Sequence, residues 1–138
     1  MGLSCRSFLA WSLAATHVAA AALGNLSPSA ALAAFATEPG FSVELVAAEP
    51  LTIDPVAVAF DEAGRLFVAE DRDYPLGSPD GRALGIIALL EDTDGDGRMD
   101  KRTDFATGLK FPNGVMPWRG GVIVTASPEV FWLADTNG

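Results

Sequence analysis

An acidic loop carries the residues of this chain best suited to chemistry. Carboxylates occupy positions 1, 3, 5 and 9 of the segment 92–100, and glycine occupies position 6. Alternate residues of a tightly curled loop point at one centre, and calcium prefers such a shell of oxygen ligands. The predicted ligands are the side chains of Asp92, Asp94, Asp96 and Asp100 and the backbone carbonyl of Arg98. We expect the bound ion to be structural.

The loop has two other interpretations, an EF-hand and a turn without metal. An EF-hand is not expected, because position 12 is Thr103 where an EF-hand has glutamate, and no clear helix flanks the segment. The loop resembles instead the D-x-D-x-D-G-x-x-D calcium loops in the β-hairpins of propellers such as those of integrin alpha chains. The remaining alternative is a solvated Asp-Gly turn without metal. Repulsion among four carboxylates within nine residues favours calcium.

The N-terminal third of the chain has the layout of a secretory signal. Residues 7–23 carry no charge and follow Arg6, and small-x-small cleavage sites end at Ala33 and Ala36. We expect residues 1–36 to be removed on export, which places residues 37–138 in the periplasm or at the cell surface. The alternative is an uncleaved anchor, and membrane association is expected only through this segment.

Composition excludes several classes of chemistry. The chain has 9 Lys and Arg against 18 Asp and Glu, so its surface repels nucleic-acid phosphates. Cys5 and His17 are its single cysteine and histidine, and both precede residue 37. Residues 37–138 therefore offer no disulfide, no C-x-x-C-H haem attachment, no imidazole base and no thiolate. No catalytic residue is identified.

Short apolar runs separated by glycine and proline predict an all-β fold. Residues 37–138 contain 12 Gly and 8 Pro, so long helices are not expected. Several runs are apolar at consecutive positions, which a strand tolerates only when both faces are covered, and here sheets must cover sheets. The predicted strands are residues 56–60, 66–69, 86–90, 102–106, 122–126 and 130–134.

An internal repeat predicts a β-propeller. The segment 89–95, Leu-Leu-Glu-Asp-Thr-Asp-Gly, recurs as residues 132–138, Trp-Leu-Ala-Asp-Thr-Asn-Gly, and residues 59–69 align loosely with residues 117–126. A propeller needs about four to eight blades, and the predicted strands supply the first blade and part of the second. We therefore expect residues 37–138 to be an incomplete propeller and the chain to be an N-terminal fragment.

Longer stretches carry a resemblance to a known family. They are Gly40 to Pro50, Asp54 to Asp61, Ala69 to Pro75, Leu89 to Gly97 and Gly108 to Val115 followed by Pro117 to Gly121. Together they resemble the membrane-bound dehydrogenases of planctomycetes and verrucomicrobia. Members of that family are similar to glucose and sorbosone dehydrogenases, whose propeller would bind pyrroloquinoline quinone, and many continue into a C-x-x-C-H haem domain. The resemblance implies oxidation of a sugar or alcohol outside the cytoplasm, with the haem motif absent from this fragment.

The same resemblance directs attention to two loops. Loops that enter the innermost strands of a propeller face its central channel, and the insertion 71–85 and a predicted turn at residues 111–114 are such loops. The candidate cofactor-binding residues are Arg72, Asp73, Tyr74 and Asn113, with Arg72 suited to an anionic carboxylate. The alternative is a surface ion pair between Arg72 and Asp73, with Tyr74 covering a blade edge.

Two functions follow from these expectations. The first is the N-terminal part of an exported, quinoprotein-like dehydrogenase, the fragment itself being inactive. The second is a non-catalytic, calcium-stabilised propeller that binds protein or glycan at the cell surface.

Overall fold

The computed structural model describes residues 26–136, and the core of the predicted signal lies outside them. The chain begins there with a short helix, α1 (Pro28–Ala34), whose N-cap Ser27 accepts a hydrogen bond from the backbone N–H of Ala30. The helix buries no side chain. No helix within residues 26–136 is long and apolar enough to cross a membrane.

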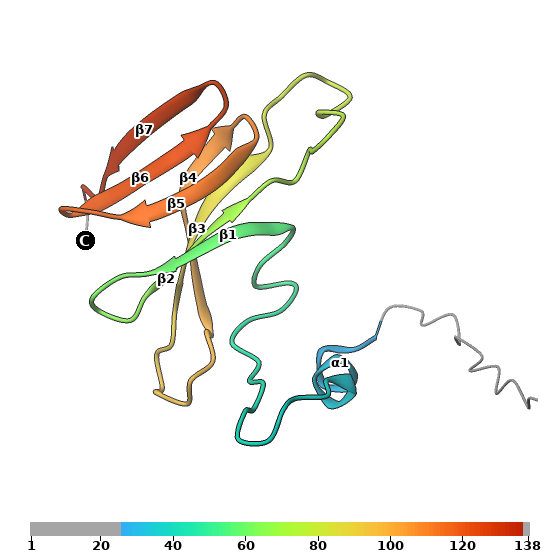
Figure 1. Cartoon of the computed structure of the whole chain (residues 1–138). Coiled ribbons are helices and arrows are strands. Elements are labelled where there is room, and N and C mark those ends of the chain that lie inside the picture. The colour runs from blue at the N-terminus through green and yellow to red at the C-terminus, as the bar shows by residue number, and fades with distance from the viewer. Residues whose placement is uncertain (1–25, 137–138) are drawn as a thin grey trace, which may run out of the picture.

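Seven strands form two antiparallel sheets (Figure 1). The first sheet is a four-stranded meander in the order β1-β2-β3-β4, and the second follows in the order β5-β6-β7. The strands are β1 (Pro55–Phe60), β2 (Leu66–Glu70), β3 (Gly85–Glu91), β4 (Lys101–Leu109), β5 (Pro112–Pro117), β6 (Gly121–Ala126) and β7 (Glu129–Ala134). The predicted all-β class is confirmed, and each of the six predicted strands is present.

One strand was missed by sequence reasoning. Residues 111–114 were predicted to be a turn, but Pro112 to Gly114 belong to β5, which pairs with β6. The prolines stand at the two ends of β5, where a missing N–H costs little, and a register shift between Pro112 and Gly114 absorbs the irregular start. The turn-like sequence Pro-Asn-Gly therefore marks a bulged strand entry.

The sequence repeat corresponds to equivalent strands in the two sheets. Residues 59–69 and 117–126 form the β1-β2 and β5-β6 hairpins, and the repeated segments at 89 and 132 lie at the ends of β3 and β7. Each sheet thus begins with the same three-stranded meander. This arrangement is consistent with a propeller blade followed by part of another.

The central strands β2 and β3 are buried on both faces, for different reasons. One face of these strands packs against Val122 and Val124 of the second sheet and forms a core with them. Its side chains are Phe67, Ala69, Ile87 and Leu89. On the other face a second core, Leu66, Val68, Ala88 and Leu90, packs against Val46, Ala47 and Leu51 of the irregular segment before β1. The expectation that sheets cover sheets therefore holds for one face, and an irregular segment covers the other.

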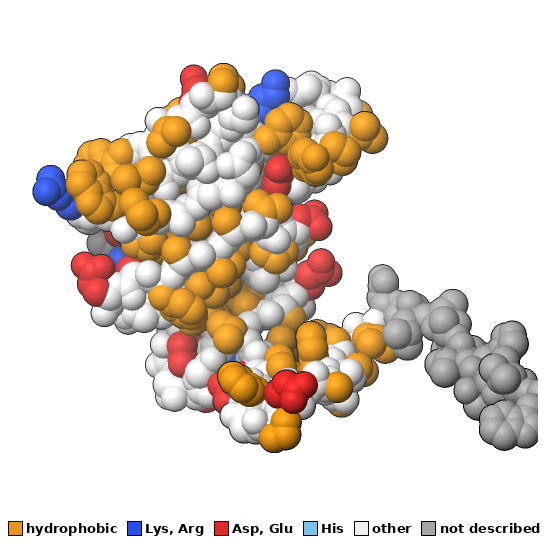
Figure 2. All heavy atoms as spheres, viewed as in Figure 1, with side chains coloured by type: hydrophobic (Ala, Val, Ile, Leu, Met, Phe, Trp, Pro, Cys, Tyr) orange, Lys and Arg blue, Asp and Glu red, His pale blue; other side chains and the backbone are white. Residues whose placement is uncertain are grey.

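Outer strands leave apolar side chains exposed. Figure 2 shows hydrophobic side chains across the middle of the molecule, where Figure 1 places β1, and Val56, Val58 and Phe60 of that strand are all exposed. Strand β7 likewise exposes Val130 and Trp132. Because residues 130 and 132 lie on the same side of the strand, one apolar face of β7 is partly open to solvent among the described residues.

The meander places its loops alternately at two ends. One end holds the insertion between β2 and β3 and the link from β4 to β5, while the other holds the β1-β2 hairpin and the β3-β4 loop (Figure 1). The two groups of candidate site residues therefore lie at opposite ends of the first sheet.

Candidate functional site

The β3-β4 loop brings three of its carboxylates together. Carboxylate oxygens of Asp92, Asp94 and Asp100 all lie within 4.8 Å of one another. The hairpin positions them, because Glu91 pairs with Lys101 at the strand ends and the N–H of Asp100 donates to the carbonyl of Glu91 at 2.9 Å. Residues eight apart in sequence thus face each other across the loop entrance.

Backbone hydrogen bonds hold the loop in its curled form. The two carboxylate oxygens of Asp92 accept hydrogen bonds from the N–H of Gly95 at 2.7 Å and from the N–H of Gly97 at 2.9 Å. These bonds lower the pKa of Asp92, and the bond from Gly97 has the larger effect. Gly97 has a φ of 88°, which favours glycine as predicted. Asp96 accepts from the N–H of Arg98 at 2.8 Å and lies outside the converging group.

The size of the cluster fits a calcium ion. Calcium–oxygen distances are about 2.3–2.6 Å, so oxygens on opposite sides of one ion are about 5 Å apart. Three oxygens within 4.8 Å of one another can therefore contact a single ion. All three residues are partly or fully exposed, so water can complete the shell.

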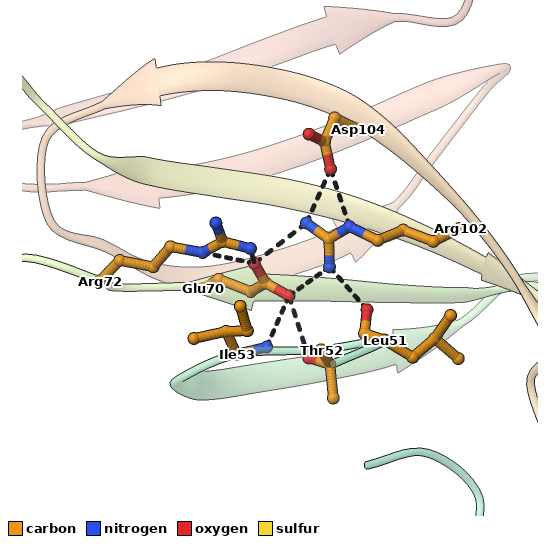
Figure 3. A network of polar contacts seen from close by, with 7 residues as sticks. All are labelled: Leu51, Thr52, Ile53, Glu70, Arg72, Arg102 and Asp104. Atoms are coloured by element: carbon orange, nitrogen blue, oxygen red, sulfur yellow. Dashed lines mark hydrogen bonds and ion pairs between the residues drawn. The ribbon is translucent and has the colours of Figure 1, made fainter. Parts of the chain in front are cut away.

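The predicted cofactor residue Arg72 is held by an acid that sequence reasoning overlooked. Its guanidinium donates to Glu70 from Nε at 3.0 Å and from Nη2 at 2.6 Å, so the alternative of an Arg72–Asp73 ion pair is wrong. Glu70, at the end of β2, has 0% exposure and also binds Arg102 of β4 (Figure 3). Its Oε1 accepts from the Thr52 hydroxyl and the Ile53 N–H as well.

This Glu70 network ties three parts of the chain together. Arg102 also donates to the carbonyl of Leu51 at 2.8 Å and pairs with Asp104 at 2.7 Å. Burial alone would raise the pKa of Glu70, but the hydrogen bonds from Arg102, Ile53, Arg72 and Thr52 outweigh it and lower that pKa. Residues 66, 68 and 70 of β2 point to the same side of the sheet, so Glu70 shares its face with Leu66 and Val68. An acid on an apolar strand face needs charged or hydrogen-bonding partners, and this is the sequence signal that could have identified Glu70.

The other predicted cofactor residues lie near one another but have separate contacts. Tyr74 is exposed and meets Phe111 edge to face, with ring centroids 6.0 Å apart. Asn113, two residues on in β5, accepts a hydrogen bond from the Thr125 hydroxyl at 2.6 Å. Asp73 is buried and lines a cavity of about 380 Å³ between the insertion and the β4-β5 link. Cofactor binding by these residues stays a prediction.

Comparison with known proteins supplies a family. A model described as "Domain of unknown function (DUF7133)" matches residues 27–138. The chain belongs to this family. The DUF7133 match covers all seven strands and both candidate sites, and its description assigns no activity. No curated protein and no solved structure matches the chain.

Proposed function

We propose that this DUF7133 domain is a calcium-stabilised blade module of an exported protein. The observation that carries the proposal is the convergence of Asp92, Asp94 and Asp100 within 4.8 Å in the β3-β4 hairpin of a four-stranded meander. A cation there offsets the repulsion of the carboxylates and fixes the hairpin that joins the third and fourth strands. The role proposed for the ion is structural.

Calcium should bind this loop weakly, with a dissociation constant on the order of 10⁻⁴ to 10⁻³ M, as in extracellular modules. Asp94→Ala removes one converging carboxylate without touching the Asp92 bonds to Gly95 and Gly97, which hold the turn. We expect the variant to lose about tenfold or more in calcium affinity at this loop. Isothermal titration calorimetry of the full chain measures this loss.

A matched control lies in the same loop. Asp96 has the same charge and exposure but lies outside the converging group, so Asp96→Ala should lose less affinity than Asp94→Ala. Equal losses in the two variants would show that the ion is attracted only by the charge of the loop. Unchanged heat in Asp94→Ala would place the ion elsewhere.

We further propose that the protein containing this domain is an exported dehydrogenase for a sugar or alcohol. Support comes from the resemblance of its sequence stretches to the quinone-dependent dehydrogenases. The contacts of Arg72 and Asp73 do not favour binding of an anionic quinone by these two residues. The guanidinium of Arg72 is already paired with Glu70, and Asp73 is a buried acid that would repel an anion. No chemical step is therefore placed on them.

Dye reduction tests this second function. With added pyrroloquinoline quinone, calcium and a panel of sugars and alcohols, we expect the 138-residue chain alone to reduce no dye. A longer protein that contains the domain should reduce it. If that longer protein is also inactive but binds glycan or protein, the non-catalytic alternative is favoured; activity of the 138-residue chain would contradict the inactive role proposed for it.

A further inference from the structure

A second group of carboxylates lies at the end of the sheet opposite the β3-β4 loop. Asp54 precedes β1, and Asp71 and Asp73 directly follow β2. The N–H of Asp71 donates to the carbonyl of Asp54 at 3.1 Å, which joins the start of β1 to the end of β2. Asp73 is only 9% exposed, so its charge is largely removed from water.

The inner oxygens of this group have no partner among the described residues. Oδ1 of Asp71 and Oδ1 of Asp73 are both buried, and neither accepts a hydrogen bond. Burial, followed by the charges of Asp73 and Asp54, raises the pKa of Asp71. A buried acceptor without a donor is costly, and two in one three-residue segment indicate a ligand that supplies positive charge.

The neighbouring basic side chains do not supply that charge. Arg72 stands between the two aspartates in sequence, yet its guanidinium binds Glu70 at 2.6 Å. Arg82, across the cavity, is paired with Asp80 at 2.6 Å. Lys110 lies with its ammonium 5.8 Å from the centre of the Phe111 ring. The cavity of about 380 Å³ that Asp73 lines has room for an ion with several waters.

We propose that Asp71 and Asp73 bind a divalent cation beneath the insertion, with Asp54 adding negative charge beside them. Two carboxylates completed by water are a common ligand set for hard divalent ions. The ion would tie the insertion to the starts of β1 and β5, at the end of the sheet remote from the Asp92 loop. This site is independent of the calcium loop proposed above, so either can fail without the other.

Thermal unfolding of the full chain in an Asp94→Ala, Asp100→Ala background, which keeps one of the three converging carboxylates of the β3-β4 loop, tests the second site. We expect saturating calcium or magnesium to raise Tm by at least about 4 °C. Adding Asp71→Asn and Asp73→Asn should abolish this rise. These changes keep side-chain shape and remove repulsion, so the cation-free Tm should not fall, and an unfolded variant is recognised from that Tm.

A matched control and a second measurement complete the test. Asp80→Asn removes an exposed acid of the same insertion and should leave the rise intact. Terbium, which takes oxygen-rich calcium sites, should give emission sensitised by Tyr74, the single tyrosine of the chain, and Tyr74→Phe should weaken that emission without changing the calcium-induced rise in Tm. Absence of any cation-dependent rise in the Asp94→Ala, Asp100→Ala background, or a rise that survives the double Asn substitution, would overturn the proposal.

Discussion

Glu70→Gln should destabilise the folded chain by about 3 kcal/mol, which is a large part of the stability of a small domain. Glu70 has no exposure, and its carboxylate accepts from two arginines, a hydroxyl and a backbone N–H. The amide retains one acceptor but leaves Arg102 and Arg72 without their anionic partner. Both guanidiniums are partly exposed, so water recovers part of the loss. Urea unfolding at pH 7 measures the change.

The difference between wild type and Glu70→Gln should depend on pH. The pKa of Glu70 in the folded chain lies below its ordinary value of 4.5. Its stabilising contribution is therefore fully present above pH 4.5 and is lost as the pH falls through the lower, folded-state pKa. The free energies of unfolding of the two proteins should converge in acid, because the variant has no carboxyl to titrate at this position.

Asp104→Asn provides the matched control for this substitution. Asp104 binds the same arginine, Arg102, but its side chain is 47% exposed, so its loss should cost less than about 1 kcal/mol. Equal costs for the two substitutions would show that burial of Glu70 has no energetic consequence. A difference between Glu70→Gln and wild type that stays constant from pH 7 to pH 3 would contradict the lowered pKa.

The strands were predictable because their signals are local. Apolar, β-branched runs between glycines mark β1, β2, β3, β6 and β7, and consecutive apolar residues in β2 and β3 correctly indicated cover on both faces. Strand β5 lacked that signal, since Pro112, Asn113 and Gly114 are typical of turns and only pairing with β6 makes them a strand. The residues that cover each face of β2 and β3 depend on the tertiary fold. The sequence around Val46 did not indicate that this irregular segment covers one of those faces.

The candidate sites also differ in whether a local sequence pattern could predict them. The Asp92 loop is a contiguous pattern, and its spacing identified three carboxylates that converge. The partner of Arg72 was not predictable from the neighbouring residue Asp73, because Arg72 binds Glu70 instead. Glu70 also binds Arg102, which is 32 residues away in sequence. A buried network depends on which strands lie side by side, and this became visible only with the β2-β3-β4 order.

Ile87→Ala should cost about 3 kcal/mol, because Ile87 is fully buried in the core that joins the two sheets. The substitution removes methyl and methylene groups between Phe67 and Leu89 of the first sheet and Val122 and Val124 of the second. Since both sheets bury their apolar faces in this one cluster, the loss should appear in both. Urea unfolding followed by far-UV circular dichroism and by tryptophan fluorescence measures it, Trp118 and Trp132 reporting on the second sheet.

Coincidence of the two signals distinguishes a shared core from two separate sheets. Wild type and Ile87→Ala should each unfold in a single transition by both probes, with the midpoint of the variant lowered equally in each. Val58→Ala is the control, because Val58 is 59% exposed on β1 and should cost less than about 1 kcal/mol. If Ile87→Ala shifted the dichroism transition and left the fluorescence transition in place, the second sheet would be stable without the first. The core cluster that Ile87 shares with the β6 valines would then contribute little to holding the sheets together.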